Sequence, residues 1–252
     1  MTGKESRNGT VVLSIDLPSE GANGGRVNDT LAKRLFQMLE SRHLPASWVP
    51  QDPQSFSLRH DLAATNTRHD LALVGDSSWI GKAAGRTRFA RELAARIEAV
   101  RSANINVSAI ALRDTHLDDH LDLLVKHRVG MIRGQRRGGL SLQPQSVRFG
   151  VWYSPISVVL PQQNDWSWIR QSWTLRQIVR RAIRAAGVAH IMIDAARMEQ
   201  KTAALAQFDL VLAHLQRQRD RGLLTVTSLS GLTESLIQRP TLKHATSILR
   251  TA

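Results

Sequence analysis

The sequence contains no cysteine among its 252 residues. This absence excludes disulfide bonds, zinc sites built on thiolates and cysteine nucleophiles. No apolar run reaches the roughly 18 residues that a transmembrane helix needs. The first ten residues, MTGKESRNGT, lack the apolar core of a signal peptide. We therefore expect no membrane span, and a cytoplasmic location is the default expectation.

Acidic residues are scarce. The chain has 21 Asp and Glu against 34 Lys and Arg, which gives a formal net charge of +13. Such a surplus favours anionic partners, namely nucleic acid, an anionic glycan, phospholipid headgroups or an acidic protein. No acid occurs between Asp122 and Asp165. That span is either a binding surface or a solvated loop that keeps the protein soluble.

Strand and helix patterns alternate through almost the whole chain. Apolar runs predict strands at 10–16, 46–50, 71–74, 105–112, 129–132, 147–160 with an interruption at Pro155, 188–193 and 223–227. Apolar positions three and four residues apart predict helices at 28–42, 53–61, 86–102, 115–126, 174–186, 202–221 and 230–237. Seven or eight such units favour a closed or nearly closed α/β barrel, with a doubly wound open sheet as the alternative. We expect one domain at 10–237, a disordered N-terminus at 1–9 and a polar tail at 238–252.

Functional residues in a parallel α/β fold lie at the carboxyl ends of the strands. The first predicted strand ends in Ser14-Ile15-Asp16-Leu17-Pro18-Ser19, and the third is followed by Gly75-Asp76-Ser77-Ser78-Trp79-Ile80-Gly81. A later strand ends at Arg113, another at Asp194, and the last is RGLLTVTSL at 221–229. In order and spacing, residues 10 to 232 resemble the polysaccharide deacetylase (NodB-homology) family. The resemblance implies a distorted, incomplete (β/α) barrel.

The resemblance also assigns roles to single positions. In that family the first strand ends in two acids, a general base and a metal ligand, and Asp16 matches the base. The other positions have changed type: Leu17 replaces the metal-binding acid, Ser77 and Gly81 replace two metal-binding histidines, and Asp194 replaces the catalytic-acid histidine. Arg113 keeps the family's residue type. Because leucine and glycine offer no donor atom, we expect no metal at this site and no other cofactor.

A different metal site remains an alternative. His116 and His120 are four residues apart in a predicted helix, where they would share one face as in zinc-binding His-x-x-x-His. The central glutamate of a zinc hydrolase motif is missing, and the run also fits an acidic first turn of an exposed helix.

Tryptophan is unusually frequent relative to tyrosine, with six Trp and one Tyr. Sugar rings and bases both stack on flat aromatic faces. We predict ligand stacking for Trp79 at a strand end and for Trp166 and Trp168 in a loop, with core packing as the alternative for each. If the loop is extended, Trp166 and Trp168 cannot both face inward, so one should be exposed or cap a cleft.

A basic stripe is predicted on the helix at 174–186. Arg176, Arg180 and Arg184 recur every four residues, opposite the apolar side of the helix. We expect this stripe to be exposed and to govern the choice of a polyanionic partner through salt-dependent contacts.

Three functions are compatible with these residues. The first is a deacetylase-like domain that lacks metal-dependent hydrolysis and binds a glycan or supports polysaccharide assembly. The second is an active carbohydrate hydrolase or deacetylase with Asp16 and Asp194 as an acid–base pair and Arg113 beside them. The third is a basic protein that binds nucleic acid or another polyanion. A protein partner is compatible with all three.

Overall fold

The computed structural model describes residues 8–18, 26–54, 56–81, 85–102, 105, 107–113, 115–134, 143–161, 168–201 and 203–238. Within these ranges the strands form one sheet of ten strands in the order β6-β7-β5-β4-β3-β2-β1-β9-β8, with β10 also paired to β1. Apart from the antiparallel pair β6–β7, every pair is parallel. The strand bounds are β1 Gly9–Asp16, β2 Ser47–Val49, β3 Asp70–Gly75, β4 Val107–Leu112, β5 Met131–Arg133, β6 Gln145–Ser146, β7 Trp152–Ser154, β8 Val158–Leu160, β9 Val188–Asp194 and β10 Leu224–Thr227.

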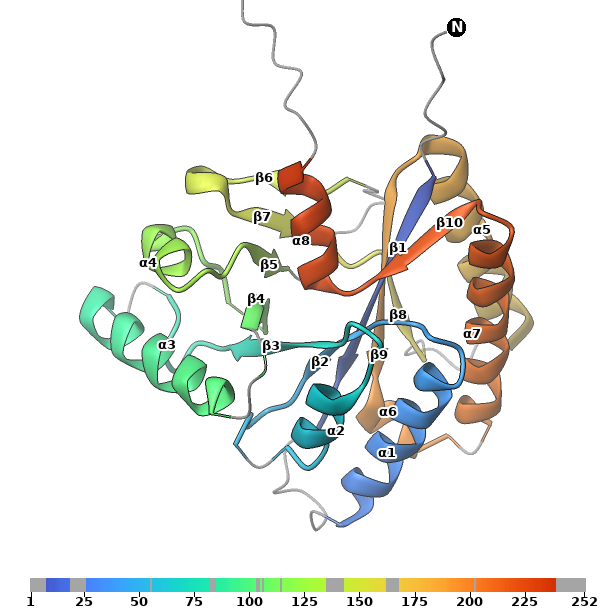
Figure 1. Ribbon diagram of the computed structural model, residues 1–252, viewed down its shortest axis with the longest axis horizontal. Helices are drawn as coiled ribbons and strands as arrows, with labels where there is room; N and C mark the ends of the chain where they lie inside the picture. The colour runs from blue at the N-terminus through green and yellow to red at the C-terminus, as the bar shows by residue number, and fades with distance from the viewer. Residues whose placement is uncertain are drawn as a thin grey trace, which may run out of the picture.

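The sheet curls without closing, because β6 and β8 end the order and do not pair with each other in the described part of the chain. Figure 1 shows the strands fanning out from the long central strand β1. This arrangement confirms the prediction of an α/β, incomplete (β/α) barrel. The doubly wound alternative is wrong, since one side of the sheet is an enclosed interior and most of the helices lie on the other side.

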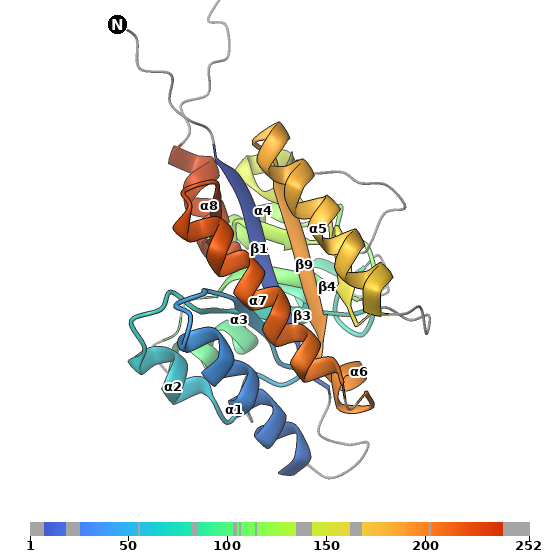
Figure 2. The same cartoon turned by 90° about the vertical axis from the view of Figure 1, so that its right-hand side faces the viewer.

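Helices follow most strands and cover the outside of the sheet. Their bounds are α1 Arg26–Glu40, α2 Arg59–Ala64, α3 Gly85–Arg101, α4 Leu121–Lys126, α5 Trp168–Ala185, α6 Ala195–Glu199, α7 Ala204–Asp220 and α8 Leu229–Gln238, with a short 3-10 helix at Arg148–Gly150. Figure 2 shows α5 and α7 running side by side over β1 and β9. None of the helices in the described ranges meets the length and hydropathy that crossing a bilayer requires.

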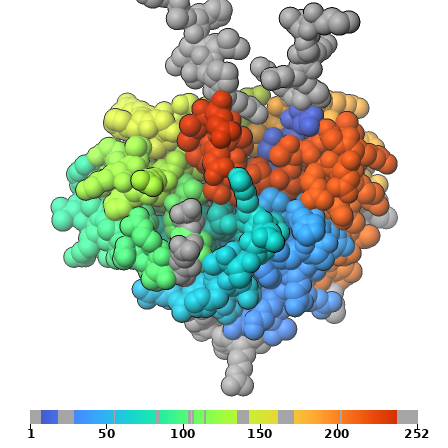
Figure 3. Space-filling model, in the orientation of Figure 1, coloured from blue at the N-terminus to red at the C-terminus, as the bar shows by residue number. Residues whose placement is uncertain are grey.

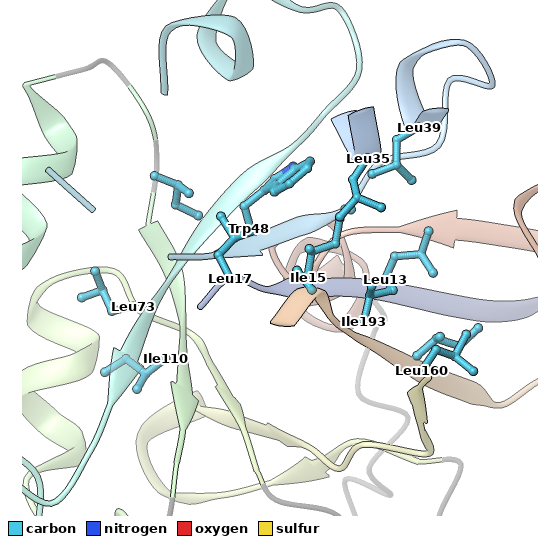
Figure 4. Packing of buried hydrophobic residues seen from close by; sticks show 14 of the residues in the cluster. Leu13, Ile15, Leu17, Leu35, Leu39, Trp48, Leu73, Ile110, Leu160 and Ile193 are labelled. Atoms are coloured by element: carbon cyan, nitrogen blue, oxygen red, sulfur yellow. The ribbon is translucent and has the colours of Figure 1, made fainter. Parts of the chain in front are cut away.

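Strand β1 shows how the pattern of residues builds both sides of the sheet. Side chains alternate across a strand. Leu13 and Ile15 therefore join the large hydrophobic cluster between sheet and outer helices, together with Leu17 and Trp48 (Figure 4). The intervening Ser14 and Asp16 face the interior of the curved sheet.

Helix α8 fills part of that interior. Its buried residues Leu229, Leu232 and Leu236 pack with Val12 and Val74 in a second cluster on the inner face of the sheet. In the space-filling view, the atoms of α8 lie between those of β6 and β7 on one side and those of α7 on the other (Figure 3). The carboxyl ends of β1 and β9 are left free of α8, and the candidate site lies there.

Several predicted boundaries are wrong. Helix α4 begins at Leu121 rather than at 115, because His120 takes the left-handed conformation with φ of 62° and residues 115–120 are not helical. The strand predicted at 147–160 begins only at Trp152, because Arg148–Gly150 form a 3-10 helix, whereas its predicted interruption at Pro155 is confirmed by the gap between β7 and β8. Gly9 and Gln238, assigned to the terminal tails, belong to β1 and α8.

Candidate functional site

A cleft of about 410 Å³ opens at the carboxyl ends of the central strands. Its polar lining consists of Asp16, Arg113, Arg133, Asp194 and Arg197, and its apolar lining includes Leu17, Leu112, Ile156, Val159 and Met192. Strand register brings the two acids together, since Asp16 is the direct partner of Asp194 in the β1–β9 pair. This is the position in which parallel α/β folds bind ligands, and the volume is ordinary for such a site.

The carboxylate of Asp16 is bound by a buried arginine. Both terminal nitrogens of Arg133 donate to it, Nη1 to Oδ1 and Nη2 to Oδ2, the latter at 2.8 Å. The Arg133 side chain is 1% exposed and that of Asp16 is 7% exposed. Such two-pronged pairs are strong and geometrically specific. Arg133 lies in the acid-free span between Asp122 and Asp165, and nothing in the local sequence indicates this contact.

A chain of hydrogen bonds continues from Arg133 beneath the cleft. Arg133 Nη1 donates to Ser14 Oγ at 3.2 Å, and Ser14 Oγ lies 2.9 Å from His190 Nε2. His190 Nδ1 lies 3.1 Å from Ser154 Oγ. Burial, reinforced by the charge of Arg133, lowers the pKa of His190 to about 3. The imidazole is therefore neutral near neutral pH, so one ring nitrogen donates and the other accepts, and this network fixes the position of Arg133.

Asp194 is also occupied. Its Oδ1 accepts a hydrogen bond from the backbone N–H of Arg197 at 3.1 Å, which caps helix α6, and its Oδ2 lies 3.0 Å from Arg197 Nε. An acid at this position satisfies an otherwise free N–H at the start of the helix. Asp194 is thus bonded to its own helix rather than directed at Asp16.

Arg113 stands at the edge of the cleft. Its Nη1 donates to Gln51 Oε1 at 2.6 Å and its Nη2 to the Leu17 carbonyl at 3.4 Å, while Nη2 lies 3.9 Å from Asp16 Oδ2. The expected meeting of Asp16 with Arg113 is therefore present. The Arg113 side chain is 34% exposed, so part of its guanidinium is accessible to a ligand.

The residues at this site do not fit a divalent metal ion. Leu17 has no donor atom and belongs to the hydrophobic cluster, whereas Gly81 has no side chain and lines a separate hollow rather than this cleft. Both oxygens of Asp16 are already bonded to a cationic side chain. Among the described residues, no group of three or more His, Asp or Glu side chains is placed to hold a metal. The sequence lacks the donor atoms of a metal site, and in the structure the remaining acid, Asp16, is bound by Arg133 instead.

The predicted helical pair His116 and His120 is wrong in its geometry. Residues 115–120 are not helical, so the two side chains do not share a helix face. They line a separate hollow of about 310 Å³ with Asp118 and Asp119. This hollow is part of the described chain in which no metal-binding group is found.

The ligand-stacking role predicted for Trp79 is wrong. Its side chain is 1% exposed, one ring face stacks on Phe89 with ring centroids 5.6 Å apart, and the Arg96 guanidinium lies 5.0 Å from the centroid. No face of the indole is open to a sugar. Trp166 lies outside the described residues, and Trp168 begins α5 with a side chain that the described structure does not cover.

Comparisons with known proteins give structural matches only. No protein-family model matches the chain, and no curated protein does. A putative polysaccharide deacetylase from Mycobacterium smegmatis has a TM-score of 0.71 at 12% identity, covering 94% of this chain and 93% of that one. A probable polysaccharide deacetylase from Pseudomonas aeruginosa PAO1 has a TM-score of 0.62 at 9% identity, covering 92% and 91%.

A CE4 family pseudoenzyme from Bacillus anthracis has a TM-score of 0.50 at 9% identity, covering 90% of this chain and 66% of that one. Identities this low show the fold and leave the activity open. The chain has the polysaccharide deacetylase fold, with the metal-ligand positions of that family replaced.

Proposed function

We propose that the cleft binds a glycan without hydrolysing it by the metal-dependent route. The observation that carries this proposal is the ion pair with buried Arg133, which occupies Asp16, the one acid left at the end of strand β1. Without a metal there is no Lewis acid to polarise an acyl carbonyl or to activate water. The pseudoenzyme among the structural neighbours supports this, because it shows that the fold exists in a form described as inactive.

A metal-free acid–base mechanism has less support. Asp16 and Asp194 are direct partners in the sheet, yet each carboxylate is bonded to a guanidinium, Asp16 to Arg133 and Asp194 to Arg197. A general base needs a free lone pair within reach of the proton that it removes. Each acid is therefore held by an arginine of its own rather than paired with the other acid. Hydrolysis therefore enters the proposal only as an outcome that would refute it.

The charge of the cleft indicates the class of glycan. Three arginines, Arg113, Arg133 and Arg197, face two aspartates, so the cleft carries one net positive charge. The side chains of Arg113 and Arg197 are each about one-third exposed, so a ligand in the cleft can reach them. Arginine binds carboxylate and phosphate groups in a two-pronged geometry. We therefore expect preference for a glycan that carries an anionic group.

The test compares two oligosaccharides of equal length by calorimetry, a neutral cello-oligosaccharide and one containing glucuronic acid. The acidic oligosaccharide should bind more tightly. Replacing Arg113 with alanine should weaken that binding by roughly tenfold to a hundredfold, because hydrogen bonds to charged groups contribute about 1.5–3 kcal/mol each. Arg91→Ala is the matched control, since this arginine is 76% exposed on the distant helix α3.

Two results would refute the proposal. One is equal binding by the wild type and the Arg113→Ala variant. The other is release of acetate from acetylated oligosaccharides by protein supplied with zinc, cobalt or nickel. A cytoplasmic location stays a prediction from the sequence, and fractionation of cells that express the chain would test it.

A further inference from the structure

Helices α5 and α7 carry matching rows of side chains on their outer surfaces. On α5 the row is Trp173, Arg176, Arg180 and Arg184, and on α7 it is Leu210, His214, Arg217 and Arg221. Members of each row are three or four residues apart, so each row runs along one face of its helix. The two helices run in the same direction, since α5 leads into β9, α7 leads into β10, and both strands are parallel to β1.

Helices α5 and α7 lie side by side (Figure 2), and His214 of α7 lies near the charges of both rows. Burial lowers the pKa of His214, and the charges of Arg176, Arg217, Arg180 and Arg221 lower it further. Two of these arginines lie on α5 and two on α7, so the two rows are neighbours on the surface.

All five arginines of the two rows are exposed and lack an acidic partner in the described part of the chain. Helix α5 contains no acid. The two acids of α7 are bonded elsewhere, Asp209 to Arg42 at 2.7 Å and Asp220 to Arg219 at 3.0 Å. Among the described residues, five like charges therefore stand together without an acidic partner, which confirms the exposure predicted for Arg176, Arg180 and Arg184 and extends that stripe to a second helix.

Large apolar side chains stand at one end of both rows. Trp173 is 63% exposed and Leu210 is 57% exposed, and both lie toward the N-terminal ends of their helices. An exposed leucine offers nothing to a phosphate backbone, whereas insertion of leucine and tryptophan between lipid headgroups removes apolar surface from water. The combination of arginines with a protruding Trp–Leu pair is typical of proteins that lie on a bilayer surface.

We propose that the face formed by these two rows docks on an anionic lipid surface. The arginines contact the headgroups while Trp173 and Leu210 insert at the interface. The N-terminal ends of α5 and α7 lie toward the carboxyl ends of the strands that follow them. When the protein docks, the end of the molecule that contains the cleft is therefore the end nearest to the inserted Trp173 and Leu210. The inference stands independently of what the cleft binds.

The test measures co-flotation of the full chain with vesicles made of equal parts phosphatidylcholine and phosphatidylglycerol, and with vesicles of phosphatidylcholine alone. We expect binding only to the anionic vesicles. The variant Arg176→Glu/Arg180→Glu/Arg217→Glu should lose about a hundredfold or more in partitioning, since each basic residue near an anionic surface contributes roughly fivefold. The matched control is Lys33→Glu/Arg34→Glu/Arg88→Glu, which makes the same change of charge at exposed positions on α1 and α3 and should bind as the wild type does.

A second variant separates lipid from a soluble polyanion. Trp173→Ser/Leu210→Ser keeps every charge and should weaken vesicle binding by about tenfold, because it removes the apolar insertion. Its binding to inorganic polyphosphate, a soluble polyanion without bases or sugar rings, should not change. The proposal is overturned if the wild type ignores anionic vesicles, if the control triple variant loses as much as the test variant, or if the serine variant binds vesicles as the wild type does. Circular dichroism and thermal unfolding confirm that each variant is folded.

Discussion

His190 gives the buried network below the cleft a pH dependence that can be measured. Its pKa in the folded protein is about 3, against an ordinary value of 6.5. As the pH falls below about 6.5, the unfolded chain binds a proton at this residue and the folded chain does not. The stability that His190 contributes is therefore complete above the unfolded pKa and is lost progressively down to the folded pKa.

The size of the effect follows from the same two values. At about pH 5 the unfolded state gains about 2 kcal/mol from protonating His190, whereas at about pH 7.5 it gains almost nothing. We predict that the variant His190→Gln, whose side chain cannot be protonated, does not lose this stability on acidification. Glutamine also alters packing and the bonds to Ser14 and Ser154, but that cost is independent of pH to a first approximation.

The assay is urea unfolding of wild type and variant at both pH values. The free energy of unfolding of the wild type minus that of the variant should be measured at each pH. This difference should be smaller at about pH 5 than at about pH 7.5, by about 2 kcal/mol. Other histidines with lowered pKa, such as His69, contribute to both proteins and cancel in the difference. The control variant His60→Gln, at an exposed position, should lose as much stability on acidification as the wild type does. If the wild type and His190→Gln lose stability in parallel on acidification, His190 is not a buried neutral group.

Two further changes test the site and its surroundings. Arg133→Leu leaves Asp16 buried without its partner, so the free energy of unfolding should fall by about 3–5 kcal/mol. The double variant Asp16→Leu/Arg133→Leu should recover much of that loss in urea titrations. If the single variant is as stable as the wild type, the buried pair is contradicted. Trp79→Ala should cost about 3–5 kcal/mol of stability because it empties a packed site against Phe89, and a stable variant that loses only glycan binding would restore the ligand-stacking role.

Local pattern predicted the fold well. The alternation of Leu13 and Ile15 with Ser14 and Asp16 belongs to a single strand, and the stripe Phe89, Leu93, Ile97 and Val100 belongs to a single helix, so both are readable from nearby residues. The order of strands and helices then led to the resemblance and to the incomplete barrel. Boundaries were less accurate where a single residue such as His120 takes an unusual backbone conformation.

The candidate site was predicted only in part. Asp16, Arg113 and Asp194 were found because strand ends of a parallel sheet meet at one edge. The partner of Asp16 was missed because Arg133 lies 117 residues away, and no local pattern marks which cation of a basic span turns inward. Trp79 was misassigned because its position directly after a strand suggested the cleft. Its packing instead depends on the helix that follows it.

The pairing of β1 with β10 has a consequence for how the chain acquires its structure during synthesis. Strand β1 is the central strand, yet one of its partners and the helix α8 that fills the interior come from the far end of the described chain. A ribosome extends the chain by roughly 5–20 residues per second. Until residues beyond 224 emerge, the inner face of β1 lacks the helix that covers it, and part of its edge is unpaired. The nascent chain therefore exposes apolar and strand-edge surface for most of its synthesis, and chaperones that bind such surface have their longest access to this protein before it is released.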